Sequence, residues 1–364
     1  MGLEPTTYSL GSCHSTTELC PQQAGIVSVC GAARQALEWA LQLHGRPGQG
    51  REGPSSVGPK SAIVRCYDAE VSHVRRVLVT GANKGIGLAI VEAVLDNQAD
   101  AFVLLGSRSA ERGRAAVAGL IEKRPSWADR LQLLEIDVAS DASVARAAGE
   151  VRRRFGVEPE PLYGLVNNAG VGFRSQSLRS TLEVNTLGVQ RVCEAFLALM
   201  NRRQGRIVNI TSASGPNYVS DCSPAWQRFF RDPRIERTAL QSLLDDCFSP
   251  QDLSARGLSG ANPYGLSKAC ANSYTMLLAR EHPHLHINAC TPGFIATDMT
   301  RPYADSQGGS PAELGMKPPA EGTRAPLHLL FGKLEGNGRY YGSDAQRSPL
   351  HRYRAPGTPP YSGD

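Results

Sequence analysis

No stretch of this sequence is apolar over the roughly 20 residues needed to cross a bilayer, so we expect no membrane span. The nine cysteines include no C-x-x-C pair; neither a disulfide framework nor a zinc site is indicated, and we expect no metal. The sequence also lacks a basic stripe, and its formal charge of +5 is small for 364 residues, so nucleic acid binding has little support. It has no recognisable signal peptide, and free thiols fit a reducing, cytoplasmic compartment.

Residues 1–73 differ in composition from the rest of the chain. Their first part is rich in Ser, Thr, Cys and Pro; a candidate helix follows at 32–43 and a flexible linker at 45–59. We expect a largely disordered N-terminal extension with one short helix. The alternative is an organelle-targeting leader or a docking helix. The scattered glutamates disfavour a targeting leader, because transit peptides are poor in acidic residues.

From residue 74 onward, apolar runs of strand length alternate with helical patterns. We expect strands near 76–80, 101–106, 131–136, 162–167, 206–210, 285–290 and 338–342, and helices near 85–97, 110–124, 141–154, 178–202, 262–281 and 319–331. Each right-handed crossover between parallel strands must bury one stripe of its helix against the sheet. The pattern therefore predicts an α/β domain over 74–364, built as a doubly wound parallel sheet with helices on both faces.

Polar residues and glycines follow six consecutive expected strands, which is where ligands bind in open parallel sheets. The glycines after the first strand are spaced G-x-x-x-G-x-G, and they let the backbone approach a pyrophosphate at the start of the next helix. A glycine turn alone is weak evidence, because an ordinary tight turn has the same composition. The six strand ends hold Gly81 to Gly87, Ser107 and Arg108, Asp137 and Val138, Asn167 to Gly170, Thr211 and Ser212, and Thr291 to Gly293.

The end of the second strand indicates which dinucleotide is bound. NAD sites hold an acidic residue there for the ribose 2′-OH, whereas this chain has Ser107 and Arg108. Arg108 could grip a 2′-phosphate through two parallel hydrogen bonds, and Lys84 adds a second cation; two solvated basic residues are the alternative. We expect NADP(H), with Asp137 either as an acceptor for the adenine amino group or as a simple cap.

Tyr264 and Lys268 stand four residues apart and so share one helix face. A free tyrosine has a pKa of roughly 10, and we expect the neighbouring cation to lower the Tyr264 pKa toward the range useful for acid and base catalysis. Ser212 could hold a substrate carbonyl oxygen or only cap the next turn. Asn185, inside the expected helix 178–202, could hold a water behind Lys268 or be a satisfied polar residue at a helix irregularity.

Together these motifs resemble the short-chain dehydrogenase/reductase family. The resemblance is carried by T-G-A-N-K-G-I-G (80–87), N-N-A-G (167–170), Asn185, Ser212, Y-x-x-x-K (264–268) and P-G (292–293) followed by Thr297. Within the family the chain is most similar to the monomeric NADPH-dependent carbonyl reductases, through S-R-S-A-E-R-G and N-A-C-T-P-G-F-I-A-T-D-M. The resemblance implies a seven-stranded Rossmann-type sheet, a small-molecule carbonyl substrate and a catalytic tetrad of Ser212, Tyr264, Lys268 and Asn185.

The resemblance also implies a monomer and a set of cofactor contacts. About 50 residues separate Ser212 from Tyr264, and we expect the inserted segment 213–262 to form short amphipathic helices that shield the faces other members use to tetramerise. The residues expected to bind NADPH are Gly81, Asn83, Lys84, Gly85, Ile86, Gly87, Arg108, Asp137, Val138, Asn168, Tyr264, Lys268, Ile295 and Thr297.

We therefore expect an NADPH-dependent reductase of aldehydes, ketones or quinones, with Tyr264 as the proton donor. Two alternatives stay open. One is a catalytically quiet NADP-binding sensor or partner module, and the other is an NAD-dependent alcohol dehydrogenase of the same family.

Overall fold

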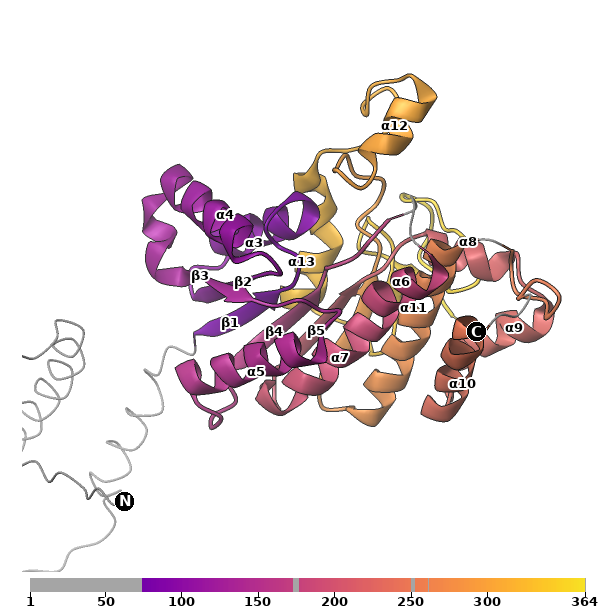
Figure 1. The fold of residues 1–364 in the computed structure, drawn as a ribbon, viewed down its shortest axis with the longest axis horizontal. Coiled ribbons are helices and arrows are strands. Elements are labelled where there is room, and N and C mark those ends of the chain that lie inside the picture. The colour runs from indigo at the N-terminus through magenta and orange to yellow at the C-terminus, as the bar shows by residue number, and fades with distance from the viewer. Residues whose placement is uncertain (1–73, 173–176, 250–252, 261, 364) are drawn as a thin grey trace, which may run out of the picture. The chain divides into compact units, whose positions relative to one another are not determined.

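The computed structural model describes residues 74–172, 177–249, 253–260 and 262–363 (Figure 1). The predicted N-terminal extension, with its candidate helix 32–43, lies outside the described residues. Within the described ranges, no helix combines the length and the apolar character needed to cross a bilayer.

One sheet forms the centre of the domain. Its strands are β1 (Arg75–Val79), β2 (Ala101–Ser107), β3 (Leu131–Glu135), β4 (Leu162–Asn167), β5 (Arg206–Ile210), β6 (His286–Cys290), β7 (Tyr340–Tyr341) and β8 (Arg347–Ser348). Their order is β3-β2-β1-β4-β5-β6-β7-β8, and every neighbouring pair from β3 to β7 is parallel. The first strand, β1, is thus central in the sheet; β2 and β3 extend the sheet to one side, and β4 to β8 extend it to the other. This order confirms the predicted doubly wound arrangement.

The predicted number of seven strands is wrong by one, because β8 pairs antiparallel with β7 at the edge of the sheet. The chain reverses between them in a turn where the Gly342 N–H donates to the Gln346 carbonyl at 2.8 Å and Ala345 adopts a left-handed φ of 61°. A strand of two residues leaves no alternating pattern in a sequence, so periodicity cannot reveal β8.

Two hydrophobic cores, one on each face of the sheet, hold the helices. Val77 and Val79 of β1 pack into one core and Leu78 into the other, as alternate side chains of a strand must. The Val77 face is covered by α3 (Gly85–Asn97), α4 (Ala110–Lys123) and α13 (Arg324–Phe331); the Leu78 face is covered by α5 (Asp141–Phe155), α7 (Gly188–Phe196) and α11 (Pro263–Glu281) (Figure 1). Because both faces are covered, a ligand reaches the central strands at their ends.

The remaining helices connect or extend this framework. They are η2 (Pro125–Arg130), α6 (Leu178–Leu182), the π-helical turn η3 (Glu183–Leu187), η4 (Leu197–Leu199), α8 (Ser214–Ser220), α9 (Pro224–Arg231), α10 (Arg237–Phe248), α12 (Arg301–Gln307) and η5 (Pro319–Thr323). The expected helix 178–202 is therefore interrupted by η3 and ends at Leu199. The helices η2 and α12 have no counterpart among the predicted ones.

The segment between Ser212 and Tyr264 contains α8, α9 and α10, which contact α11 (Figure 1). In α9, Trp226 and Phe229 form an edge-to-face pair with ring centres 5.1 Å apart. Residues 265–279 of α11 are all buried, so this helix is held firmly between the segment and the sheet. It is the helix that carries Tyr264 and Lys268.

Candidate active site

The chain turns sharply between β1 and α3 at three glycines. Gly81 and Gly85 adopt φ angles of 63° and 59°, in the left-handed region that other residues rarely occupy. A Cβ on Gly87 would lie 2.4 Å from the side-chain nitrogen of Asn168, so a larger residue does not fit there. That nitrogen donates to the carbonyl oxygens of Thr80 and Gly81 at 2.9 and 3.1 Å, which ties the end of β4 to the glycine turn.

The N-terminus of α3 opens onto this turn. Lys84 at the N-cap position makes no side-chain cap, and the first turn contains no acidic residue. The Lys84 ammonium instead pairs with Asp298 Oδ2 at 2.7 Å, and both side chains are more than half exposed. Exposed pairs of this kind are weak. The free N–H groups and the helix dipole therefore leave a place for an anion, which can compete for Lys84.

A cleft of about 650 Å³ runs along the carboxyl ends of β1 to β6. Every residue predicted to bind the cofactor lines it except Ile295. Ile295 is 2% exposed, and its carbonyl accepts a hydrogen bond from Thr300 Oγ1 at 2.6 Å; its neighbours Ala296 and Thr297 line the cleft instead. A cleft that crosses so many strand ends suits an extended dinucleotide.

Arginines stand where the cleft passes the end of β2. Arg108 follows the strand, and Arg112, one helical turn later in α4, lines the same cleft. Within the part of the chain that the structure describes, neither guanidinium has an ion pair. Sequence reasoning missed Arg112, whose spacing of four from Arg108 was a usable signal. It also missed Arg301 of α12, which lines the cleft but follows no predicted element.

Asp137 lines the cleft just beyond β3. Its Oδ1 accepts the Ala139 N–H at 3.0 Å, and its own N–H donates to Ser143 Oγ at 3.0 Å. Asp137 therefore stabilises the turn before α5, but the predicted cap role is wrong, because the N-cap of α5 is Ser140. The same carboxylate still borders the cleft, so the adenine contact stays a prediction.

A second cavity of about 260 Å³ meets the cleft at Tyr264, which lines both. Ser212, just beyond β5, lines this cavity together with Tyr264. The Ser212 Oγ accepts the Ser214 N–H at 3.1 Å, so Ser212 also caps the next turn. Burial raises the pKa of Tyr264, and the nearby Ser212 hydroxyl offsets part of that rise.

Lys268 lies one turn along α11 from Tyr264 and is 5% exposed. Its ammonium donates to the Ile210 carbonyl at 3.1 Å and lies 5.6 Å from the centre of the Tyr264 ring. Burial lowers the pKa of Lys268 to about 8. The expectation that Lys268 lowers the Tyr264 pKa is wrong for this structure, because the desolvation of the phenol dominates and raises it.

Asn185 lies in the π-helical turn η3, an irregularity often found at functional sites. Its Oδ1 accepts the Val171 N–H at 2.9 Å, and its Nδ2 donates to the Val171 carbonyl at 3.0 Å and to Ser267 Oγ at 3.1 Å. The side chain is thus buried and satisfied, as one of its two predicted roles requires. A Cβ on Gly170 would lie 3.2 Å from Asn185 Oδ1 and 3.7 Å from Lys268 Nζ, so the space above Gly170 adjoins both side chains.

Comparison with known proteins agrees with this geometry. A family model described as short chain dehydrogenase matches residues 75–224. Carbonyl reductase (NADPH) 1 from Sus scrofa is 30% identical over 275 residues, covering 71% of this chain and 88% of that protein. The chain belongs to the short-chain dehydrogenase family. Carbonyl reductase (NADPH) 3 from Mus musculus is 33% identical to this short-chain dehydrogenase over 273 residues, covering 71% of this chain and 91% of that protein, which confirms the predicted likeness to carbonyl reductases.

A solved structure shares the fold of this short-chain dehydrogenase. Salutaridine reductase from Papaver somniferum superimposes with a TM-score of 0.59 at 25% identity, covering 73% of this chain and 99% of that one. The family is one of oxidoreductases. Among the described residues, no group of three or more His, Cys, Asp or Glu side chains is placed to hold a metal ion.

Proposed function

We propose that this short-chain dehydrogenase reduces aldehydes, ketones or quinones to alcohols with NADPH. The observation that carries the proposal is that Tyr264 lines both cavities and Ser212 lines the smaller one beside it, with the Lys268 ammonium buried 5.6 Å from the centre of the phenol ring. The larger cavity has the glycine turn and the length of a dinucleotide site, and the smaller one leaves room for a small substrate. A proton donor therefore stands where the two molecules would meet.

The residues of the cleft fit NADPH. The open N-terminus of α3 would hold the pyrophosphate, and the unpaired Arg108 and Arg112 would hold the 2′-phosphate. An acidic residue at the end of β2 would repel that phosphate, and this chain has Ser107 and Arg108 there. When bound, NADPH supplies the hydride that reduces the carbonyl carbon. The NADPH in the names of the Sus scrofa and Mus musculus relatives supports the same choice.

Ser212 and Tyr264 line the smaller cavity, where the reacting oxygen would lie, and Lys268 lines the adjoining cleft. Ser212 Oγ donates a hydrogen bond to the substrate carbonyl oxygen and so polarises the C=O bond. The Tyr264 hydroxyl, which its raised pKa keeps protonated at neutral pH, gives its proton to that oxygen and becomes a phenolate. The Lys268 ammonium stabilises the phenolate. It then returns a proton through the space above Gly170, which Asn185 borders.

The test is cofactor oxidation by the full chain with quinones, aromatic aldehydes, steroids and keto esters, using NADPH and NADH in parallel. We expect NADPH to be consumed in equal amount to the alcohol formed, as identified by mass spectrometry. NADPH binding without oxidation across this panel would instead favour a catalytically quiet sensor. Faster turnover with NADH, in the direction of alcohol oxidation, would favour an NAD-dependent alcohol dehydrogenase.

A further inference from the structure

The C-terminal segment of the chain forms one wall of the substrate cavity. The cavity that holds Ser212 and Tyr264 is also lined by residues 352–354 and 356. These residues follow β8 and belong to no helix or strand. The Tyr361 N–H donates to the Arg347 carbonyl of β8 at 3.0 Å, and the other bonds that hold this wall involve side chains.

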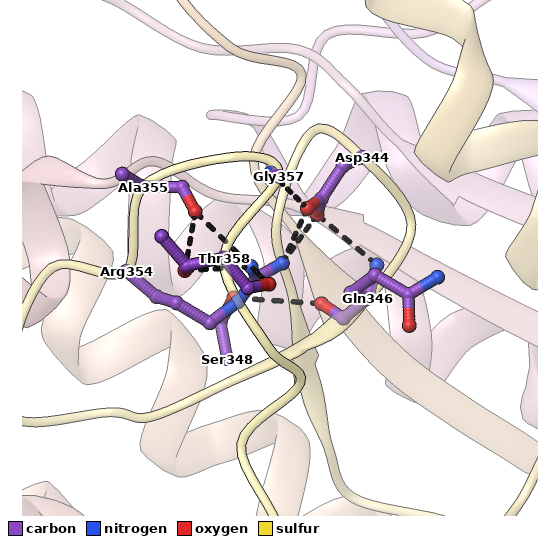
Figure 2. Close-up of polar contacts among 7 residues, drawn as sticks. All are labelled: Asp344, Gln346, Ser348, Arg354, Ala355, Gly357 and Thr358. Carbon is purple, nitrogen blue, oxygen red and sulfur yellow. Dashed lines mark hydrogen bonds and ion pairs between the residues drawn. The ribbon is translucent and has the colours of Figure 1, made fainter.

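An ion pair between Arg354 and Asp344 holds the segment (Figure 2). Arg354 Nη2 donates to both carboxylate oxygens, at 2.5 and 2.6 Å. The two side chains are 7% and 11% exposed, whereas those of the comparable pair Arg75–Asp100 are 26% and 46% exposed. Burial alone would raise the pKa of Asp344, but hydrogen bonds from Arg354 and from backbone N–H groups outweigh it and lower the pKa. The Asp344 carboxylate is therefore ionised at neutral pH.

The remaining bonds of this pair close the segment on itself. Arg354 Nε donates to Ser348 Oγ at 3.1 Å, and Nη1 donates to the Thr358 carbonyl at 2.8 Å. Asp344 Oδ2 accepts the Gly357 N–H at 3.0 Å. Figure 2 shows how these bonds join the turn before β8, β8 itself and the chain beyond Arg354. The charge of Arg354 is thus used within the segment and is not offered to a substrate.

Arg352, two residues earlier, brings a second cation to the same cavity. Its side chain is exposed and, within the described part of the chain, has no ion pair or hydrogen bond. The described lining of the cavity includes no Asp or Glu, while Phe294, Met299 and Pro216 make part of it apolar. Since Asp344 neutralises Arg354, the cavity keeps one uncompensated positive charge beside an apolar surface.

We propose that the favoured substrates are carbonyl compounds with an apolar body that ends in a carboxylate or a similar monoanion. Arg352 binds the anion, and the Asp344–Arg354 pair positions the loop that carries Arg352. A guanidinium suits this task because its planar fork matches a carboxylate. The inference rests on the proposed reductase function, since it names the substrate class for the same site.

Matched substrates test the anion. The meta and para carboxybenzaldehydes are compared with their methyl esters, using the full chain and saturating NADPH. We expect a higher kcat/KM for the acids, and we expect Arg352→Gln to lower the acid-over-ester ratio about tenfold, the effect of one lost charge-assisted hydrogen bond. The control is Arg203→Gln, an exposed arginine in the turn before β5, which should leave the ratio unchanged. Added salt should lower the ratio in the wild type but not in Arg352→Gln.

Loop variants test the positioning pair, with Asp100→Asn in the pair Arg75–Asp100 as the matched control. We expect the Asp344→Asn variant to have a raised KM for both acids and esters, with a smaller fold decrease in kcat. We also expect chymotrypsin to cleave this variant faster after Tyr353. Arg354→Lys keeps the charge without the fork, and it should fall between the wild type and Arg354→Gln. Thermal melting shows whether each variant is folded. Arg352→Gln removes none of the bonds that hold the loop, so it tests the anion site even where Asp344→Asn does not fold.

The outcomes separate this inference from the function on which it rests. Reduction of neutral aldehydes with an acid-over-ester ratio that Arg352→Gln does not change would overturn the inference and leave the reductase function standing. Unchanged KM and unchanged cleavage in folded Asp344→Asn would overturn the positioning role. If no carbonyl compound were reduced by the wild type, the function and the inference would both fall.

Discussion

The buried Lys268 makes the pH profile of this enzyme a test of its proton relay. Burial lowers the Lys268 pKa from 10.5 to about 8, so the ammonium is present below that pH and is lost as the pH rises through it. We propose that the Lys268 ammonium stabilises the Tyr264 phenolate and binds NADPH in the cofactor cleft, which Lys268 lines. If the protonated form is required, kcat/KM for NADPH should fall about tenfold between pH 7 and pH 9, because this parameter reports groups of the free enzyme.

The assay is the initial rate at varied NADPH and fixed carbonyl substrate, across that pH range at constant ionic strength. Lys268→Arg is the informative variant, since a guanidinium keeps its charge throughout and should remove the fall at high pH. Ser212→Ala is the matched control, because it should lower the rate but keep the fall. A wild-type profile that stays flat from pH 7 to pH 9 would refute the role given to Lys268.

Three other features give predictions. Replacing Arg108 and Arg112 together with alanine should weaken NADPH binding by about 2 kcal/mol and leave NADH binding nearly unchanged, and equal losses in fluorescence titrations would contradict this. Gly87→Ala, which places a Cβ 2.4 Å from the Asn168 nitrogen, should lower the free energy of unfolding in urea by about 1–3 kcal/mol, while Gly149→Ala, in open space, should not lower it. Because α8 to α10 contact α11, sedimentation should give a monomer, and a tetramer mass would overturn that prediction.

Long elements with a strong pattern could be predicted from the sequence. The helix expected at 85–97 coincides with α3, because glycines mark its start and an apolar stripe marks its length. A helix irregularity at Asn185 is one of the two predicted alternatives, but its π-helical form could not be predicted, since the Asn185 side chain bonds to Ser267, 82 residues away in the sequence. Contacts across such distances override local propensity.

Some features of the candidate site could likewise be predicted from the sequence, and others could not. Ser212 and Tyr264 could be expected together because Ser212 follows β5 and Tyr264 begins α11, the crossover helix that starts at the same edge of the sheet. The direction of the Tyr264 pKa could not be predicted, since it depends on burial by the whole fold and not on the neighbouring lysine alone. The wall built around Asp344 and Arg354 has no periodic pattern, and nothing in the sequence indicates that it borders the substrate cavity.

The most direct measurement is single-turnover reduction of a carbonyl substrate by Tyr264→Phe, alongside NADPH binding by the same variant. Phenylalanine keeps the ring in place and removes the hydroxyl to which we assign the proton transfer. We predict that the variant binds NADPH nearly as tightly as the wild type, while its turnover falls on the order of a hundredfold to ten-thousandfold. Turnover close to that of the wild type would contradict the assignment of Tyr264 as the proton donor.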